Sequence, residues 1–461
     1  MPRDWANLDT DLIGAIVKRL RIEDHIRLQA VCKGWLSALK ESTFQPQPHR
    51  QIPWLALPDG NSDTCRLYSL TDKKIHHIEL PEIRERRCCG TAHGWMVMVD
   101  NSANVLLLNP LTRSQIPLPP ITTFPEISEI GEGKYYYPSD MQIEMQSGEF
   151  VKKSFLEKVV LSGNPSLAKD YVVMAIYGNM QRLAFCKEGD DKWTLLEHED
   201  QTFFDVVYWK GNFYATNSTG RVAVCDLAGP VPKARIFMIP QPKIVGSQNY
   251  LVPSGNELLL VSKKLKVRSR DMNDITSWNL NDVDEHHNEY GDNYDHEEEV
   301  YGNANYDDHE DDGVDNIDIV EENPNYEDND DDDNNWESDD NEDEVDDYDN
   351  RVFLYKTEEF RVFKLDEEKL FWVKVTSLDD RILFVGYNFG LSLSANDFPE
   401  CKADHIYFTD DRSHIWNDHI VGGHDLGVYS LKNGEIEPFP CCPESTWLIW
   451  PPPYWVTLSP Y

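Results

Sequence analysis

Four groups of histidine and cysteine residues come closest in type and spacing to a metal site. They are His76-His77, Cys88-Cys89 with His93, Cys441-Cys442, and the set His414, His419 and His424. Neighbouring residues of a strand point to opposite faces of a sheet, so the adjacent pairs cannot share one ion. Histidines five residues apart are expected in loops that face water. We therefore predict no metal site and no cofactor at these groups.

One acidic segment has part of the spacing of a calcium-binding loop. Asp308, Glu310 and Asp312 precede Gly313 at the intervals of an EF-hand. The twelfth position needs a bidentate acid, and this chain has Ile319 there. The sequence predicts no flanking helices, so we expect no calcium site.

Motifs of common catalytic sites are absent from the sequence. It contains no G-x-S-x-G, no H-E-x-x-H and no phosphate-binding glycine loop that ends in lysine. Acidic residues such as Asp205, Asp226 and Asp397 lie near predicted turns, where hydrogen bonding to the local backbone accounts for them. We therefore expect a protein that is not an enzyme, with a propeller enzyme as a remote alternative.

The strong negative charge of the chain is confined to one segment. The formal net charge is −39 over 461 residues, but residues 271–350 hold 35 of the 82 acidic residues and no Lys or Arg. The rest of the chain has a net charge of only −4. A segment this acidic, with few aliphatic residues, cannot bury enough apolar surface to offset the conformational entropy lost on ordering. We therefore predict that the insert is disordered.

The cysteine content and the N-terminus indicate where the protein works. Nine cysteines, an odd number with no Cys-x-x-Cys pair, are spread along the chain. The start of the sequence has no secretion signal, and no apolar run is long enough to span a membrane. We expect a cytoplasmic or nuclear location, with neither membrane nor nucleic acid as partner.

A basic run, residues 263–270, directly precedes the acidic insert. Its alternation fits the edge of a strand better than a nuclear import signal. The acids could fold back onto this run, or they could attract a basic partner such as a histone tail. A solvated segment without a dedicated partner is the interpretation we favour.

The first 40 residues have the pattern of short helices. The apolar positions with helical spacing are Leu12, Ile13, Ile16, Val17 and Leu20. This spacing predicts one apolar side of a helix, which Asp9 or Thr10 can cap at its N-terminus. Helices this short are marginal alone in water, so the apolar side must pack on the rest of the chain or bind a partner.

This stretch resembles the F-box motif. The matching positions are Trp5, Leu8, Asp11-Leu12, Ile16, Leu20, Asp24, Arg27, Val31-Cys32 and Trp35. Asp9 stands where the family usually has proline, so the start of the first helix is less stiffly fixed. The resemblance implies docking onto a Skp-type adaptor and through it onto a cullin ubiquitin ligase. The adaptor-binding residues it implies are Leu8, Leu12, Ile16, Leu20, Val31, Cys32 and Trp35.

After a linker at 41–53, short apolar runs replace the helical pattern. We group them into six sets: 54–57, 66–70 and 75–80; 94–99, 105–109 and 116–119; 155–161, 171–177, 182–186 and 193–196; 203–209, 212–215, 221–225 and 234–239; 250–252, 257–261, 351–355, 360–364 and 371–375; 382–385, 405–409, 427–431 and 436–439. Such repetition predicts a β-propeller of about six to seven blades, closed by residues 446–449. A pair of β-sandwiches is the alternative.

Residues 204–214 give the strongest hairpin signal of the chain. Two runs of alternating apolar residues flank Gly211-Asn212, which we predict to form the turn. Gly255-Asn256 and Asn433-Gly434 repeat this layout. The repetition supports successive antiparallel strands, as a propeller requires.

The C-terminal half also resembles a known family. Residues 388–398, NFGLSLSANDF, and residues 405–411, HIYFTDD, resemble the signature of plant F-box proteins with a KIB-type domain, long called domain of unknown function 295. The resemblance implies a propeller that binds a protein client, with a kinase among the client classes it suggests. It does not name the client or its binding residues.

Together these patterns predict five segments. They are F-box helices at 1–40, a linker at 41–53, the first part of the propeller at 54–270, the acidic insert at 271–350 and the second part of the propeller at 351–461. The function we expect is that of a substrate receptor in a ubiquitin ligase. The alternative is an acidic binding protein or chaperone for basic partners.

Overall fold

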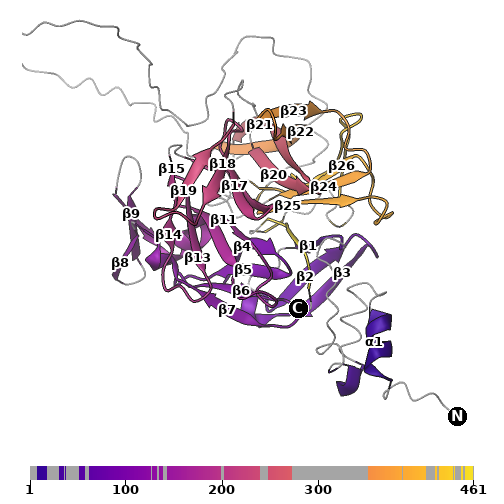
Figure 1. Cartoon of the computed structure of the whole chain (residues 1–461), viewed down its shortest axis with the longest axis horizontal. Coiled ribbons are helices and arrows are strands. Elements are labelled where there is room, and N and C mark those ends of the chain that lie inside the picture. Colours follow the sequence, from indigo (N-terminus) through magenta and orange to yellow (C-terminus); the bar gives the residue numbers. More distant parts are fainter. Residues whose placement is uncertain are drawn as a thin grey trace, which may run out of the picture. The chain divides into compact units, whose positions relative to one another are not determined.

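The computed structural model gives a mainly β protein (Figure 1). The residues described are 8–17, 31–35, 37, 51–57, 62–125, 127–131, 134–138, 143–198, 202–238, 248–271, 351–386, 388–411, 421–422, 425–439, 441, 448–449 and 452–459. The chain divides into two compact units, residues 1–270 with 352–461, and residues 271–351. The predictions for the acidic insert and its calcium-like segment lie outside the described residues.

The first unit contains a six-bladed β-propeller, so the fold prediction is confirmed and the count is six. From the inside outward, blade 1 consists of β31 (Tyr454–Val456), β1 (Trp54–Leu57), β2 (Thr64–Ser69) and β3 (Lys74–Glu79). Blade 2 consists of β4 (Arg87–Ala92), β5 (Trp95–Val99), β6 (Val105–Leu108) and β7 (Gln115–Leu118). Blade 3 consists of β11 (Leu156–Leu161), β12 (Val172–Tyr177), β13 (Arg182–Lys187) and β14 (Thr194–Leu195).

The second three blades vary this plan. Blade 4 consists of β16 (Asp205–Trp209), β17 (Asn212–Thr216), β18 (Val222–Asp226) and β19 (Lys233–Ile236), with β15 (Glu197–His198) added outside. Blade 5 consists of β20 (Gln248–Ser254), β21 (Glu257–Asp271), β22 (Arg351–Asp366) and β23 (Phe371–Val375). Blade 6 consists of β25 (Phe389–Ser394), β24 (Arg381–Gly386), β26 (His405–Phe408), β28 (Gly427–Ser430) and β29 (Ile436–Glu437).

Smaller elements complete the described structure. The helical ones are α1 (Thr10–Val17), η3 (Pro81–Ile83), η4 (Ile121–Thr123), α4 (Gly148–Phe150) and the π-helical turn η5 (Val151–Phe155). A three-stranded sheet consists of β8 (Ser128–Gly131), β9 (Lys134–Pro138) and β10 (Ile143–Ser147), and β27 (Val421–Gly422) pairs with β30 (Leu448–Ile449). No described helix combines the length and the apolar content that crossing a bilayer requires.

The C-terminal strand closes the ring. β31 pairs antiparallel with β1, with Leu55 opposite Trp455. The prediction that residues 446–449 close the ring is wrong, because Leu448 and Ile449 belong to β30. Six apolar clusters each fill the seam between two consecutive blades, including the seam between blades 6 and 1. The hydrophobic effect therefore stabilises every blade through both of its neighbours.

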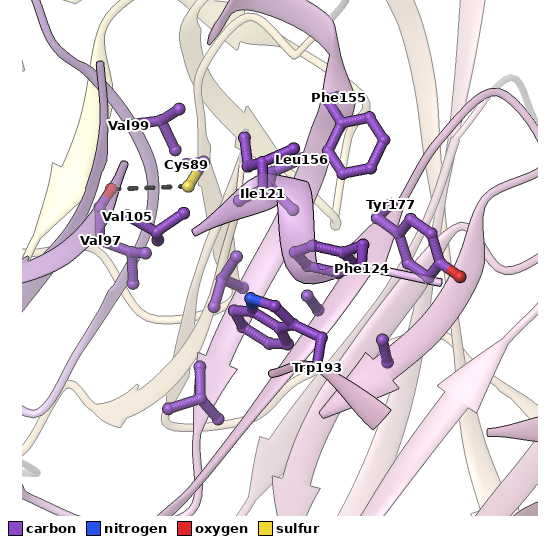
Figure 2. Packing of buried hydrophobic residues seen from close by; sticks show 14 of the residues in the cluster. Cys89, Val97, Val99, Val105, Ile121, Phe124, Phe155, Leu156, Tyr177 and Trp193 are labelled. Atoms are coloured by element: carbon purple, nitrogen blue, oxygen red, sulfur yellow. Dashed lines mark hydrogen bonds between the residues drawn. The ribbon is translucent and has the colours of Figure 1, made fainter. Parts of the chain in front are cut away.

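The seam between blades 2 and 3 illustrates this packing (Figure 2). The Phe124 ring stacks on Trp193, with ring centres 4.4 Å apart, and meets Phe155 edge to face at 5.3 Å. The Cys89 thiol donates a weak hydrogen bond to the Val97 carbonyl oxygen. Phe124 belongs to the long connection between the two blades, so this connection is anchored by the core.

The predicted hairpin of blade 4 forms with its turn shifted by one residue. Trp209 lies opposite Asn212, so the turn is Lys210-Gly211 and not Gly211-Asn212. Both turn residues have positive φ, 46° and 86°. A two-residue turn of this type matches the right-handed twist of the strands, and glycine tolerates the second position without strain.

The innermost strands of all six blades begin at one face of the ring, which we call the starting face. They are β4, β11, β16, β20, β25 and β31. Because neighbouring strands of a blade mostly alternate in direction, β21 ends and β22 begins at the starting face. The opposite face carries the turns between β16 and β17 and between β20 and β21.

Candidate functional site

The N-terminal helix α1 is capped by the residue that replaces the usual proline. The Asp9 carboxylate accepts a hydrogen bond from the Asp11 backbone N–H at 2.9 Å, and the Asp9 carbonyl accepts one from Ile13 at 3.0 Å. An aspartate at this position satisfies a free N–H and places negative charge near the positive end of the helix. Capping by a side chain therefore replaces the stiffness that proline would give.

The apolar residues of the N-terminal segment divide between exposed and buried positions. Leu12 is 55% exposed and Val31 is 59% exposed, whereas Ile13 and Trp35 are buried. The sequence grouped Leu12 and Ile13 on one apolar side, and in the chain alone only Ile13 is buried, because adjacent residues of a helix point about 100° apart. Among the described residues of the N-terminal segment, Leu12 and Val31 are thus the two large aliphatic side chains that lie mostly in water.

The other predicted adaptor-binding residues have intermediate positions. Leu8, Ile16 and Cys32 are half-buried, and Leu20 lies outside the described residues. The Cys32 sulfur accepts a hydrogen bond from the Trp35 backbone N–H at 3.5 Å, as the capping residue of a short helical turn. Trp35, being buried, supports the segment in the free chain.

The adjacent cysteines of blade 2 point to opposite sides, as predicted from strand geometry. Cys88 belongs to the seam between blades 1 and 2, and Cys89 to the seam between blades 2 and 3. Within the described part of the chain, no three His, Cys, Asp or Glu side chains converge as a metal site. His414, His419, His424 and Cys442 lie outside it.

The buried thiols should be chemically inert. Burial raises the pKa of Cys88 to about 11 and those of Cys89, Cys225 and Cys401 to about 12. At pH 8 their thiolate fractions are therefore very small. We expect iodoacetamide to alkylate the half-buried Cys32 and Cys441 first, and mass spectrometry can locate the label. In urea all nine cysteines should react; rapid labelling of Cys89 in the folded protein would contradict the burial.

A buried ion pair joins three blades at the starting face. Lys158 of β11 donates to the Asp205 carboxylate of β16, and both side chains are buried. The same carboxylate accepts hydrogen bonds from the backbone N–H groups of Leu251, at 2.6 Å, and Val206, at 2.8 Å. Burial raises the pKa of Asp205, while Lys158 and these donors oppose the shift. Asp205 is thus a link between blades, and not the local turn residue that we predicted.

A second group of buried charges joins blades 5 and 6. The Lys263 ammonium lies 2.7 Å from a carboxylate oxygen of Asp425 and 3.4 Å from one of Asp411. Asp425 also accepts hydrogen bonds from the backbone and hydroxyl of Thr357, at 2.7 and 2.8 Å. The basic run thus forms part of β21, and its first lysine is a core residue that is fully buried. Sequence alternation alone did not reveal this role.

The closing strand β31 and the buried ion pairs join the blades into a ring. The N-terminal segment with α1 adds partly exposed apolar residues to this ring. Comparison with known proteins agrees with this arrangement. Residues 67–430 match the family model described as KIB1-4 beta-propeller. The chain belongs to the KIB1-4 β-propeller family. The resemblance found in the two signature segments is thereby confirmed.

Similar curated proteins are F-box proteins from Arabidopsis thaliana. F-box protein SKIP23 is 25% identical, over 98% of this chain and 96% of its own length. F-box protein At2g17036 is 24% identical over 99% and 95%, and putative F-box protein At5g55150 is 29% identical over 44% and 53%. The first two matches span both the N-terminal segment and the KIB1-4 propeller.

The signature of the KIB1-4 propeller is explained by contacts within the ring. Ser392 of β25 hydrogen-bonds Ser254 of blade 5 at 2.9 Å. Ser394 and Asn396 both donate to the Asp380 carboxylate, at 2.6 and 3.1 Å. The second signature segment ends in Asp410, which accepts a hydrogen bond from the Tyr355 hydroxyl, and Asp411, which pairs with Lys263. These polar residues therefore stabilise the fold.

Proposed function

We propose that this protein is the substrate-receptor subunit of a Skp–cullin–F-box ubiquitin ligase. In this role the N-terminal helices bind the adaptor and the propeller binds a protein client. The protein itself performs no chemistry: it raises the effective concentration of client lysines near the ligase.

The observation that carries this proposal is the exposure of Leu12 on α1 and of Val31 in the turn before the helical residues 33–35. The ring fills its own seams with apolar side chains, so it does not require these two residues for its core. Large exposed aliphatic side chains on a marginal helix are typical of a binding surface. The F-box names of the similar Arabidopsis proteins support a Skp-type adaptor as the partner.

A lysine at position 12 should abolish adaptor binding. Leu12→Lys would place a charge in an apolar interface, and co-purification of the full chain with a Skp-type adaptor measures the effect. Thr10→Lys is the matched control, because Thr10 is also exposed on α1 but points about 160° away from Leu12 around the helix, and the same charge is added. We expect loss of the adaptor in the first variant only. Equal adaptor binding by both variants would refute the docking model.

A further inference from the structure

Two long connections of the ring begin and end at the starting face. One joins β7 of blade 2 to β11 of blade 3 (residues 119–155), and the other joins β26 to β28 (residues 409–426). On the opposite face, no described turn is longer than residues 162–171. Long connections on a rigid scaffold commonly hold the binding residues. The starting face is therefore where a recognition element should be sought.

One such element is a ribbon formed by the ends of two strands. β20 pairs with β21 only as far as Lys263, and β23 pairs with β22 only from Val362 onward. Residues 264–271 of β21 and 351–361 of β22 therefore extend past both neighbours as a two-stranded ribbon. β20 begins at Gln248, which lies opposite Lys263. Past this point no described strand pairs with the edge of β21 that faces away from β22.

Burial alternates along the ribbon and gives it two different faces. Leu265, Tyr355 and Thr357 are buried, and they follow the fully buried Lys263 on the same side. The Tyr355 hydroxyl donates to the Asp410 carboxylate of blade 6 at 2.7 Å. An isolated two-stranded ribbon is only marginally stable in water, so these contacts with the rest of the propeller stabilise it. The ribbon is consequently a fixed platform and not a loose arm.

The exposed face of the ribbon is cationic. Its described residues are Lys264, Lys266, Lys356 and Glu358. Lys264 forms an ion pair with Glu358 at 2.9 Å, whereas no described carboxylate pairs with Lys266 or Lys356. The ribbon therefore presents more positive than negative groups at regular intervals.

We propose that this ribbon binds an extended acidic segment of the client protein, an inference that rests on the proposed receptor function. Alternate residues of a strand repeat every ~6.6 Å, so alternate carboxylates of an extended peptide match the alternate cations of β21. The open edge of β21 supplies main-chain hydrogen bonds for such a peptide. Nucleic acid fits less well, because no exposed aromatic side chain accompanies the described cations.

Binding of a labelled poly-glutamate peptide to the full chain tests this inference. A triple variant that carries Lys264→Glu, Lys266→Glu and Lys356→Glu should bind the peptide about tenfold or more weakly. Added salt should further weaken peptide binding. The control variant Lys73→Glu, Lys169→Glu, Lys432→Glu makes the same charge change at exposed positions of the opposite face. We expect it to bind as the unaltered chain does. Equal thermal unfolding of both variants confirms that the fold is kept.

Each of the following results would overturn the inference. The first is equal loss of binding in both variants, and the second is tighter binding of an oligothymidine than of the peptide. The third is peptide binding seen only after residues 280–345 are deleted, which would make the acidic insert the occupant of the ribbon. Adaptor co-purification is measured separately, so a chain that binds the adaptor but not the peptide refutes this inference and leaves the receptor function standing.

Discussion

Replacing Asp205 with alanine should lower the free energy of unfolding by about 3–5 kcal/mol. The substitution leaves the Lys158 ammonium buried without its carboxylate, and it removes an acceptor from the backbone N–H of Leu251. These three groups belong to blades 3, 4 and 5, so the loss affects two seams of the ring. The midpoint and slope of urea unfolding, followed by tryptophan fluorescence, measure the change.

Two comparisons separate this effect from a general loss of charge. Glu367→Ala breaks the exposed pair of Lys210 and Glu367, whose atoms lie 2.7 Å apart, and should cost less than about 1 kcal/mol. Asp205→Ala combined with Lys158→Met should be less damaging than Asp205→Ala alone, because no unpaired charge stays buried. Lys158→Met is also measured alone. If the losses in unfolding free energy of the two single variants add up to that of the double variant, the side chains do not form a coupled pair.

Replacing Trp455 with alanine should be as damaging, about 3–5 kcal/mol, for a different reason. The Trp455 side chain is fully buried, its ring N–H donates to the Val385 carbonyl at 3.1 Å, and its ring packs on Phe384 and Phe439. Its own carbonyl accepts a hydrogen bond from Thr91 of blade 2 at 2.8 Å. One residue of a three-residue strand thus joins blades 6, 1 and 2.

Urea unfolding and limited proteolysis would both report the loss of Trp455. Cleavage should appear at the ends of blades 1 and 6, because the ring opens where its two ends meet. Tyr208→Ala is a suitable control, since Tyr208 also lies on an innermost strand but is 37% exposed. Were Trp455→Ala no more destabilising than Tyr208→Ala, closure by β31 would be refuted.

Alternating apolar runs predicted most of the outer strands of the propeller. The runs at 54–57, 171–177 and 371–375 agree with β1, β12 and β23 to within one residue. These strands have a neighbouring strand on each side or pack on a seam, so their apolar residues follow the period of the pleat. The class of fold therefore followed from the sequence alone.

The strands that prediction missed include three innermost ones, β4, β25 and β31. A side chain at Gly90 would overlap the Val159 carbonyl of the next blade, and one at Gly390 would lie 2.8 Å from the Leu251 carbonyl oxygen. β31 escaped prediction because it has only three residues, Tyr454–Val456. β4 and β25 approach the next blade backbone to backbone, so they use Gly, Cys, Ser and Thr. These small residues erase the apolar alternation on which strand prediction depends.

The candidate sites divide in the same way. The F-box resemblance located the N-terminal helices, but burial in the folded chain decided that Leu12 is exposed while Ile13 and Trp35 are not. Alternation placed the basic run on a strand, yet only the neighbouring blade shows that Lys263 is a core residue and Lys264 a surface one. The sequence by itself determined the order of helices, blades and acidic insert, because these depend on local composition and period. Tertiary structure alone decided which charges are buried and how the ring closes, because those contacts join residues far apart in the chain.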